Sequence, residues 1–174
     1  MIDASDRSSR HGLLINITGN GKGKTTGGLG TCLRALGWGW KVAVIQFVKG
    51  NGNTGESHFA QNTSLPLEFM TCGCGFSFGG NEPSTHRECA EAAFSMATDY
   101  LMNGKVDLLM LDELNIALGK GWLDTSDVIA ALKKRPEWMH VIITGREAPK
   151  ELVDASDLVS EIAEVKHPFR SGIT

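Results

Sequence analysis

Residues 13–26 read Leu-Leu-Ile-Asn-Ile-Thr-Gly-Asn-Gly-Lys-Gly-Lys-Thr-Thr. The apolar first half is typical of a buried strand, and the glycine-rich second half opens a segment with helical spacing. A glycine-rich turn between a strand and a helix lets backbone N–H groups converge on phosphate oxygens, at the positive end of the helix dipole. The pattern therefore predicts a phosphate-binding loop. Its binding residues would be Gly19, Asn20, Gly21, Lys22, Gly23, Lys24, Thr25 and Thr26.

The loop is one residue shorter than the usual phosphate-loop pattern, G-x-x-x-x-G-K-[ST], because only three residues separate Gly19 from Gly23. A shorter loop has one fewer N–H group to wrap around a phosphate, so we expect phosphates to sit differently from those in an ordinary ATPase. Lys24 adds a mobile cation, and Thr25 adds a hydroxyl for Mg²⁺. The alternative, a glycine-rich turn that binds nothing, is disfavoured by the Lys-Thr pair and the flanking strand and helix.

Composition and charge narrow the class of protein. The chain has 174 residues, 41% of them hydrophobic and 21% charged, which favours one globular domain over residues 12–174, preceded by a flexible arm at residues 1–11. The net charge of −3 and the absence of a basic block argue against a nucleic-acid partner. No apolar run is long enough for a membrane span, and the polar first residues lack the apolar centre of a secretory signal. We therefore expect a cytoplasmic protein.

Strand-like and helix-like segments alternate along the chain. Apolar runs predict strands at 13–18, 41–47, 67–71, 106–111, 139–144 and 158–165. Helical spacing predicts helices at 25–36, 86–102, from 124 to before Pro136, and 149–155, while polar residues 49–66 are expected to form a long loop. This alternation predicts a three-layer α/β fold of the P-loop nucleotidase (RecA-like) type, with helices on both faces of a mainly parallel sheet of about six strands.

An acidic pair follows the most apolar run. Asp112 and Glu113 come directly after residues 106–111, where a carboxylate at the tip of a core strand would lie beside the phosphate loop. Mg²⁺ bound to a polyphosphate prefers oxygen ligands and keeps several waters, so one carboxylate and the Thr25 hydroxyl would be enough. The pair alone would also fit a helix start. Which of the two carboxylates contacts the metal is left open by the sequence.

Other polar residues close the ends of neighbouring strands. Arg146 follows the strand at 139–144, and Gln46 and Lys49 close the strand at 41–47. Ligands of open α/β folds bind at the carboxyl edge of the sheet, so all three are candidate contacts for the phosphates. A surface ion pair is the alternative for Arg146.

Cysteines and phenylalanines mark a glycine-rich segment in the middle of the chain. We expect the four cysteines to be reduced thiols. Zinc binding by Cys72, Cys74, His86 and Cys89 is disfavoured, because a C-x-C pair is unusual for a structural zinc site. Phe76 and Phe78 have glycine neighbours and suit closing over a flat apolar ligand, with packing into the core as the alternative.

Together, several motifs resemble those of the ATP:cob(I)alamin adenosyltransferase family that carries a phosphate loop. They are found at residues 18–26 (TGNGKGKTT), 44–50 (VIQFVKG), 75–78 (GFSF), 111–114 (LDEL), 141–146 (VIITGR) and 165–167 (VKH). The match runs in order from about residue 12 to the end, and the shortened loop is a trait of that family.

The resemblance implies that the 5′-deoxyadenosyl group of ATP is transferred to the cobalt(I) of a corrinoid, with release of triphosphate. Catalytic roles are implied for Lys24, Thr25, Glu113 and Arg146, and corrinoid contacts for Phe76 and Phe78. It also implies Mg²⁺, a homodimer and a flavoprotein-type reductant as partner. Two alternatives remain: a P-loop ATPase or kinase, and a non-enzymatic, nucleotide-dependent corrinoid-binding module.

Overall fold

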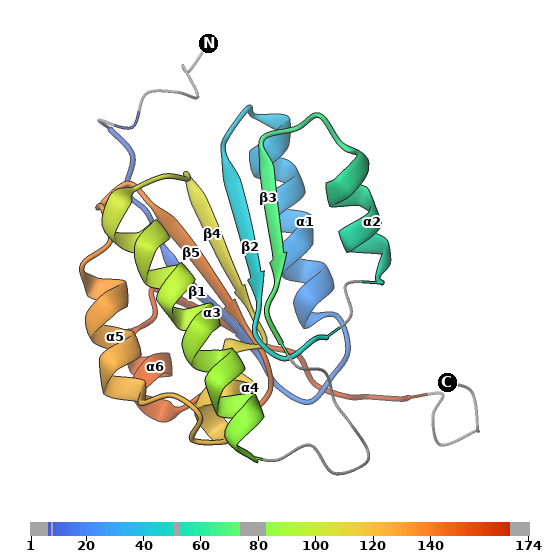
Figure 1. Ribbon diagram of the computed structural model, residues 1–174, viewed down its shortest axis with the longest axis vertical. Helices are drawn as coiled ribbons and strands as arrows, with labels where there is room; N and C mark the ends of the chain where they lie inside the picture. The colour runs from blue at the N-terminus through green and yellow to red at the C-terminus, as the bar shows by residue number, and fades with distance from the viewer. Residues whose placement is uncertain (1–6, 8, 51–52, 74–82, 168–174) are drawn as a thin grey trace.

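The computed structural model describes residues 7, 9–50, 53–73 and 83–167, which contain one six-stranded, all-parallel sheet with helices on both faces (Figure 1). The strands are β1 (Leu14–Thr18), β2 (Val42–Gln46), β3 (Leu67–Thr71), β4 (Leu108–Asp112), β5 (His140–Thr144) and β6 (Leu158–Glu161). Their order in the sheet is β3-β2-β4-β5-β1-β6. The predicted fold class is therefore confirmed.

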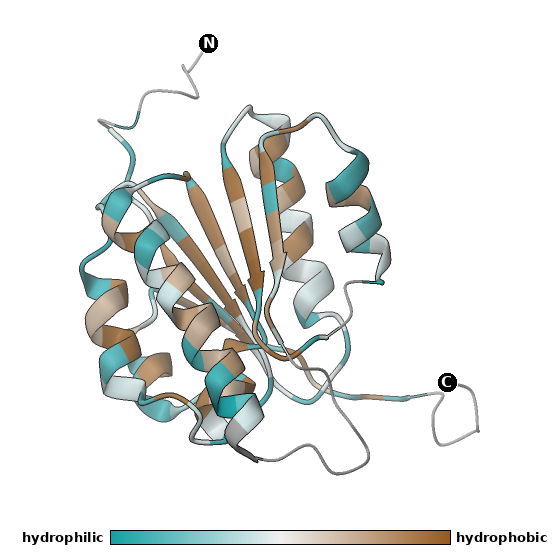
Figure 2. Ribbon diagram, viewed as in Figure 1, coloured by the Kyte–Doolittle hydropathy of each residue, from teal (hydrophilic) through white to brown (hydrophobic). Residues whose placement is uncertain are grey.

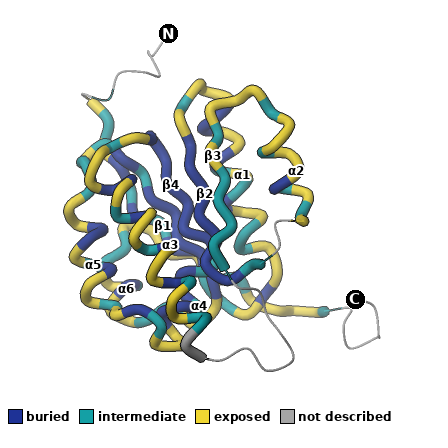
Figure 3. Tube along the Cα trace, viewed as in Figure 1, coloured by how far each residue is buried: buried dark blue, intermediate teal, exposed yellow. Residues whose placement is uncertain are grey.

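The helices divide between the two faces of the sheet. They are α1 (Lys24–Gly37), α2 (Gly55–Asn62), α3 (Pro83–Asn103), α4 (Leu114–Gly119), α5 (Thr125–Lys133) and α6 (Lys150–Ala155). α1 packs on the face of β4 that presents Leu108 and Met110, while α3 to α6 contribute to the core on the face that presents Leu109 and Leu111. Successive side chains of a strand point to opposite faces, so a strand covered on both sides is apolar throughout. Figure 2 shows this apolar concentration on the central strands, and Figure 3 shows the same strands buried.

Several predicted elements differ from the structure, which also contains α4, a helix that the sequence did not predict. The expected loop at residues 49–66 contains α2, which begins where the Thr54 hydroxyl accepts a hydrogen bond from the backbone N–H of Ser57 (3.3 Å) and so caps the helix. The last strand ends at Glu161 instead of residue 165, and all four of its residues are exposed. No described helix is long and apolar enough to cross a membrane.

The cysteines differ from the expectation at one position. Cys32 and Cys72 are free thiols, as predicted, whereas Cys89 is disulfide-bonded. The expectation of four reduced thiols is therefore wrong at Cys89. An oxidised Cys89 also offers no thiolate for the disfavoured zinc site.

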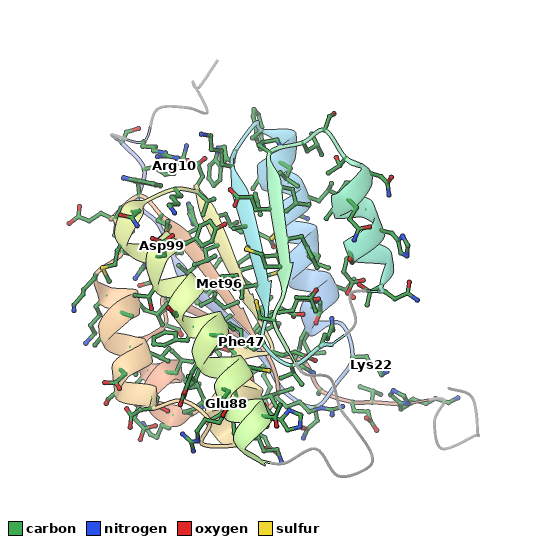
Figure 4. All side chains as sticks on the ribbon, in the orientation of Figure 1. Arg10, Lys22, Phe47, Glu88, Met96 and Asp99 are labelled. Atoms are coloured by element: carbon green, nitrogen blue, oxygen red, sulfur yellow. The ribbon has the colours of Figure 1, made fainter. Side chains whose placement is uncertain are left out.

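The described residues of the N-terminal arm are held at the amino end of the sheet. Arg7 and Arg10 both donate to the Asp107 carboxylate at 2.9 Å, and their guanidinium groups lie 3.9 Å from the ring centroids of Trp138 and Trp40 respectively. Burial opposes ionisation of Asp107, but the hydrogen bond from Arg7 and that from the backbone of Lys41 hold its pKa below the ordinary value. In Figure 4, Arg10 lies at the opposite end of the sheet from Lys22 of the phosphate loop.

Replacing Asp107 with alanine is expected to lower the free energy of unfolding by about 2–3 kcal/mol, because Arg10, whose side chain is only 11% exposed, loses its carboxylate partner. Urea denaturation measures this change. Because the folded-state pKa of Asp107 is lowered, its contribution is present above the unfolded-state pKa and is lost as the pH falls through the folded-state pKa. The difference between wild type and variant should therefore shrink below about pH 4.

The matched control is Asp154→Ala, which removes the carboxylate of an exposed pair with Lys150 on α6. This variant should unfold with nearly the wild-type midpoint, because exposed pairs contribute little. Equal destabilisation by the two substitutions would contradict the anchoring role of Asp107.

Candidate functional site

The phosphate-binding loop joins β1 to α1 at the carboxyl edge of the sheet. Gly19 and Gly23 have φ values of 94° and 111°, in the region that glycine adopts at little cost. Gly23 is the N-cap of α1; no side chain caps the helix, and its first turn carries no acidic residue. The N–H groups at this helix start therefore remain available for an anionic ligand.

The back of the loop is supported by the chain that follows β6. The backbone N–H of Gly21 donates to the carbonyl oxygen of Ile162 at 2.7 Å. A β-carbon on Gly19 would lie 2.5 Å from that same oxygen, and one on Gly21 would lie 2.6 Å from the carbonyl oxygen of Ala163. The close approach of two backbones therefore requires glycine at both positions.

A cavity of about 360 Å³ opens in front of the loop. It is lined by Gly21, Lys22, Gly23, Lys24, Thr25, Thr26, Lys49, Glu113, Ile116, Thr144, Gly145 and Arg146. Four of these residues are cationic, and they come from three separate parts of the chain. Burial and the nearby Arg146 guanidinium lower the pKa of Lys24, whose ammonium donates to the Gly21 carbonyl at 2.6 Å. Such a concentration of positive charge favours a polyanionic ligand.

Asp112, at the end of β4, organises the floor of the site. Its side chain is fully buried. One carboxylate oxygen accepts from the hydroxyls of Thr25 (2.8 Å) and Thr144 (2.7 Å). The other accepts from Gln46 (2.9 Å) and Lys49 (3.2 Å). Four donors satisfy this buried charge, so Asp112 fixes the residues around it.

Glu113 differs from Asp112 in both backbone and environment. It has a positive φ of 65° between β4 and α4, and its backbone N–H donates to the Thr144 hydroxyl at 3.0 Å. Among the described residues, its Oε2 atom is buried without a hydrogen-bond partner. Burial, followed by repulsion from Asp112, raises the pKa of the Glu113 carboxyl. Thr25 and Glu113 line the same cavity, and a hydroxyl together with a carboxylate oxygen fits the oxygen-donor set that Mg²⁺ prefers.

The structure brings most of the predicted site residues to this cavity, with four exceptions among those described. Asp112 is fully buried and does not line the cavity. Gln46 is buried behind Asp112 and does not line the cavity. Gly19 shapes the loop from behind, and Asn20 is exposed outside the cavity lining. Phe76 and Phe78 lie outside the described residues. Of the disfavoured zinc set, His86 stacks on the Trp122 ring with centroids 5.1 Å apart.

Two features of the site were not predicted from the sequence. Thr144 bridges Asp112 and Glu113 through one hydroxyl, and its only sequence signal is a polar residue closing an apolar strand next to Gly145. Asn16 and Asn115 form a fully buried pair, in which Asn115 Nδ2 donates to Asn16 Oδ1 (2.9 Å) and to the Gly145 carbonyl (3.2 Å). A polar residue inside an apolar strand was the signal for Asn16.

The strand-loop-helix unit, the Lys-Thr pair and the acidic end of β4 define the P-loop class of α/β proteins. Comparison of the sequence with known families gives a match to ATP:corrinoid adenosyltransferase BtuR/CobO/CobP over residues 10–174. The chain therefore belongs to the ATP:corrinoid adenosyltransferase family, whose members transfer the adenosyl group of ATP to a corrinoid.

Curated relatives agree with this assignment. The corrinoid adenosyltransferase of Pseudomonas aeruginosa is 41% identical over 162 residues, which cover 93% of this chain and 80% of the relative. Those of Escherichia coli K12 and Salmonella typhimurium are each 36% identical, covering 93% of this chain and 82% of the relative. Among solved structures, the flagellar accessory protein FlaH of Methanocaldococcus jannaschii is similar, with a TM-score of 0.56 and 13% identity, covering 87% of this chain and 71% of FlaH. This likeness concerns the fold.

Proposed function

We propose that this chain catalyses attack by the cobalt(I) of a reduced corrinoid on the C5′ atom of ATP, with the triphosphate leaving intact. Cobalt(I) is itself a strong nucleophile, so the protein need not provide one. Its task is to hold the two substrates in line and to stabilise the charge that develops on the leaving oxygen. The observation that carries the proposal is the cavity itself, where Lys22, Lys24, Lys49 and Arg146 converge on one anion site.

Lys24, Lys49 and Arg146 would contact the polyphosphate together with the N–H groups of the loop. Their charge has more effect on the leaving group as negative charge accumulates there, which is the condition for a faster chemical step. The short loop, supported from behind by Ile162, would hold the triphosphate so that the ribose C5′ faces the corrinoid.

Thr25 and Glu113 are the residues that we propose to hold Mg²⁺, because one offers a hydroxyl and the other a carboxylate oxygen that no described residue hydrogen-bonds. Asp112, whose oxygens already accept four hydrogen bonds, would orient Thr25 and would not itself bind the ion. When bound, Mg²⁺ would supply positive charge to the triphosphate. This proposal assigns the direct metal contact to Glu113 and not to Asp112.

Phe76 and Phe78 are proposed to cover the lower face of the corrinoid and exclude water from cobalt(I), a role carried over from the family. The acceptors are proposed to be cob(I)alamin and cob(I)yrinic acid a,c-diamide. The homodimer, the flavoprotein-type reductant and the cytoplasmic location likewise rest on the resemblance and the sequence.

The test is incubation of the protein with ATP, Mg²⁺ and chemically reduced cobalamin. We expect equal amounts of adenosylcobalamin, identified by a spectrum that changes on exposure to light, and intact tripolyphosphate. Phe76→Ala and Phe78→Ala should slow this reaction while leaving ATP affinity unchanged.

The alternatives give different products in the same experiment. ADP and phosphate without a cobalt–carbon bond would support a P-loop ATPase or kinase. Stoichiometric ATP binding without adenosylation, even with strong reductant, would support a non-enzymatic binding module. Either outcome would overturn the proposed reaction.

A further inference from the structure

Lys49 is held between two carboxylates that come from different layers of the fold. Its ammonium lies 3.2 Å from Oδ2 of Asp112, at the end of β4, and 3.3 Å from Oε1 of Glu56, in the first turn of α2. The same residue lines the phosphate cavity. Lys49 is thus the contact through which α2, an element that the sequence did not predict, reaches the site.

The position of Glu56 is fixed locally. The Thr54 hydroxyl caps α2. The Glu56 carboxylate interacts with its own backbone N–H and with this Thr54 hydroxyl. Burial disfavours the ionised carboxylate, but these hydrogen bonds and Lys49 lower the pKa of Glu56. Glu56 is therefore an anchored anion, and its side chain is 26% exposed.

The side chain of Lys49 is long and flexible, and its contacts with the two carboxylates restrict its conformation. A lysine ammonium has three N–H donors on a flexible stem of four carbons. Burial opposes the charge, but Asp112, first by charge and then by its hydrogen bond, keeps the pKa of Lys49 above its ordinary value. Two of the three donors face Asp112 and Glu56, and no described residue accepts from the third, which can therefore donate to a ligand in the cavity.

We propose that Glu56 is a positioning residue, which acts through Lys49 to aim one ammonium N–H at the polyphosphate. Without Glu56, the ammonium would be drawn toward Asp112 alone and away from the cavity. Glu56 itself would not contact the phosphates, since two anions repel each other. This inference rests on the proposed function only in taking a polyphosphate as the ligand of the cavity.

The experiment measures binding of inorganic tripolyphosphate, without corrinoid, by titration calorimetry on the full chain. Glu56→Gln keeps the size of the side chain and removes its charge, and we expect binding to weaken about 5- to 10-fold. Lys49→Met should weaken it at least as much. In the Lys49→Met background, Glu56→Gln should have no further effect, because the residue through which it acts is already absent.

Glu91→Gln, an exposed carboxylate of α3, is the matched control for charge and should bind like wild type. Glu56→Asp, which retains the charge on a shorter side chain, should recover part of the lost affinity. In steady-state assays, Glu56→Gln should raise the KM for ATP more than it lowers kcat.

Two outcomes would overturn the inference. The first is an unchanged affinity of the Glu56→Gln variant for tripolyphosphate. The second is an equal loss of affinity when Glu56→Gln is introduced into the wild type and into Lys49→Met, which would mean that Glu56 only stabilises α2. The proposed function is tested by a different result. If the wild-type protein bound tripolyphosphate and showed the coupling between Glu56 and Lys49 but formed no adenosylcobalamin, the reaction would be disproved and the positioning role of Glu56 would stand.

Discussion

Replacing Lys24 with alanine is expected to lower the rate of adenosyl transfer by about 10³-fold, the loss typical when a donor to a developing anion is removed. The Lys24 ammonium already lies within the loop, on the Gly21 carbonyl, and a bound polyphosphate would compete for it. Single-turnover absorbance measurements of cobalt–carbon bond formation report the rate of the chemical step. Calorimetry with ATP reports the affinity of the protein for ATP in the ground state. The rate should fall by a larger factor than the ATP affinity.

Lys134→Ala provides the control, because this exposed lysine follows α5 and lies outside the cavity lining. It should leave both rate and affinity unchanged. A Lys24→Ala protein that lost ATP affinity but kept its single-turnover rate at saturating ATP would show that Lys24 only binds nucleotide.

Replacing Glu113 with glutamine is expected to affect activity and stability in opposite directions. Turnover should fall about 100-fold, because an amide is a poor ligand for Mg²⁺ and supplies no negative charge. The free energy of unfolding without ligand should be maintained or rise by up to about 1 kcal/mol, since a buried carboxylate repelled by Asp112 is removed. Thermal unfolding with and without MgATP, alongside the turnover assay, measures both effects.

Glu147→Gln is a close match as a control. Glu147 is the other described non-glycine residue with a positive φ (55°), and it is an exposed carboxylate near the site. Its substitution should change neither turnover nor the stabilisation by MgATP. If Glu113→Gln were destabilised without ligand and still fully active with Mg²⁺, the carboxylate would be a structural residue and the metal contact would have to come from Asp112.

The parts of the fold that the sequence predicts are those with a strong local signal. The central strands β2, β4 and β5 are nearly continuous apolar runs because both of their faces are covered, and α1 carries a clear stripe of buried residues. α2 gave no such signal, since Ser57 is its single buried residue and its start depends on the Thr54 cap. Its nearly polar sequence is therefore hard to tell from a loop.

Prediction of the site from the sequence was likewise limited to residues that are neighbours in the chain. The loop and the acidic pair could be predicted because each is contiguous in sequence, but the different roles proposed for Asp112 and Glu113 depend on the left-handed turn at Glu113. Asp112, still within β4, accepts from four donors, whereas Glu113, at the turn, has one carboxylate oxygen without a partner among the described residues. Likewise, the Lys49–Glu56 pair spans the predicted loop, where spacing alone carries no information about contact.

The hydrogen bond from Gly21 to Ile162 has a consequence for biosynthesis. The loop between β1 and α1 lies near the start of the chain, yet the backbone that it packs against, at Ile162 and Ala163, follows β6. On the ribosome, the turn therefore emerges long before its support does. A nascent chain would reach its full affinity for nucleotide only after β6 and the residues that follow it have been translated and have packed against the loop.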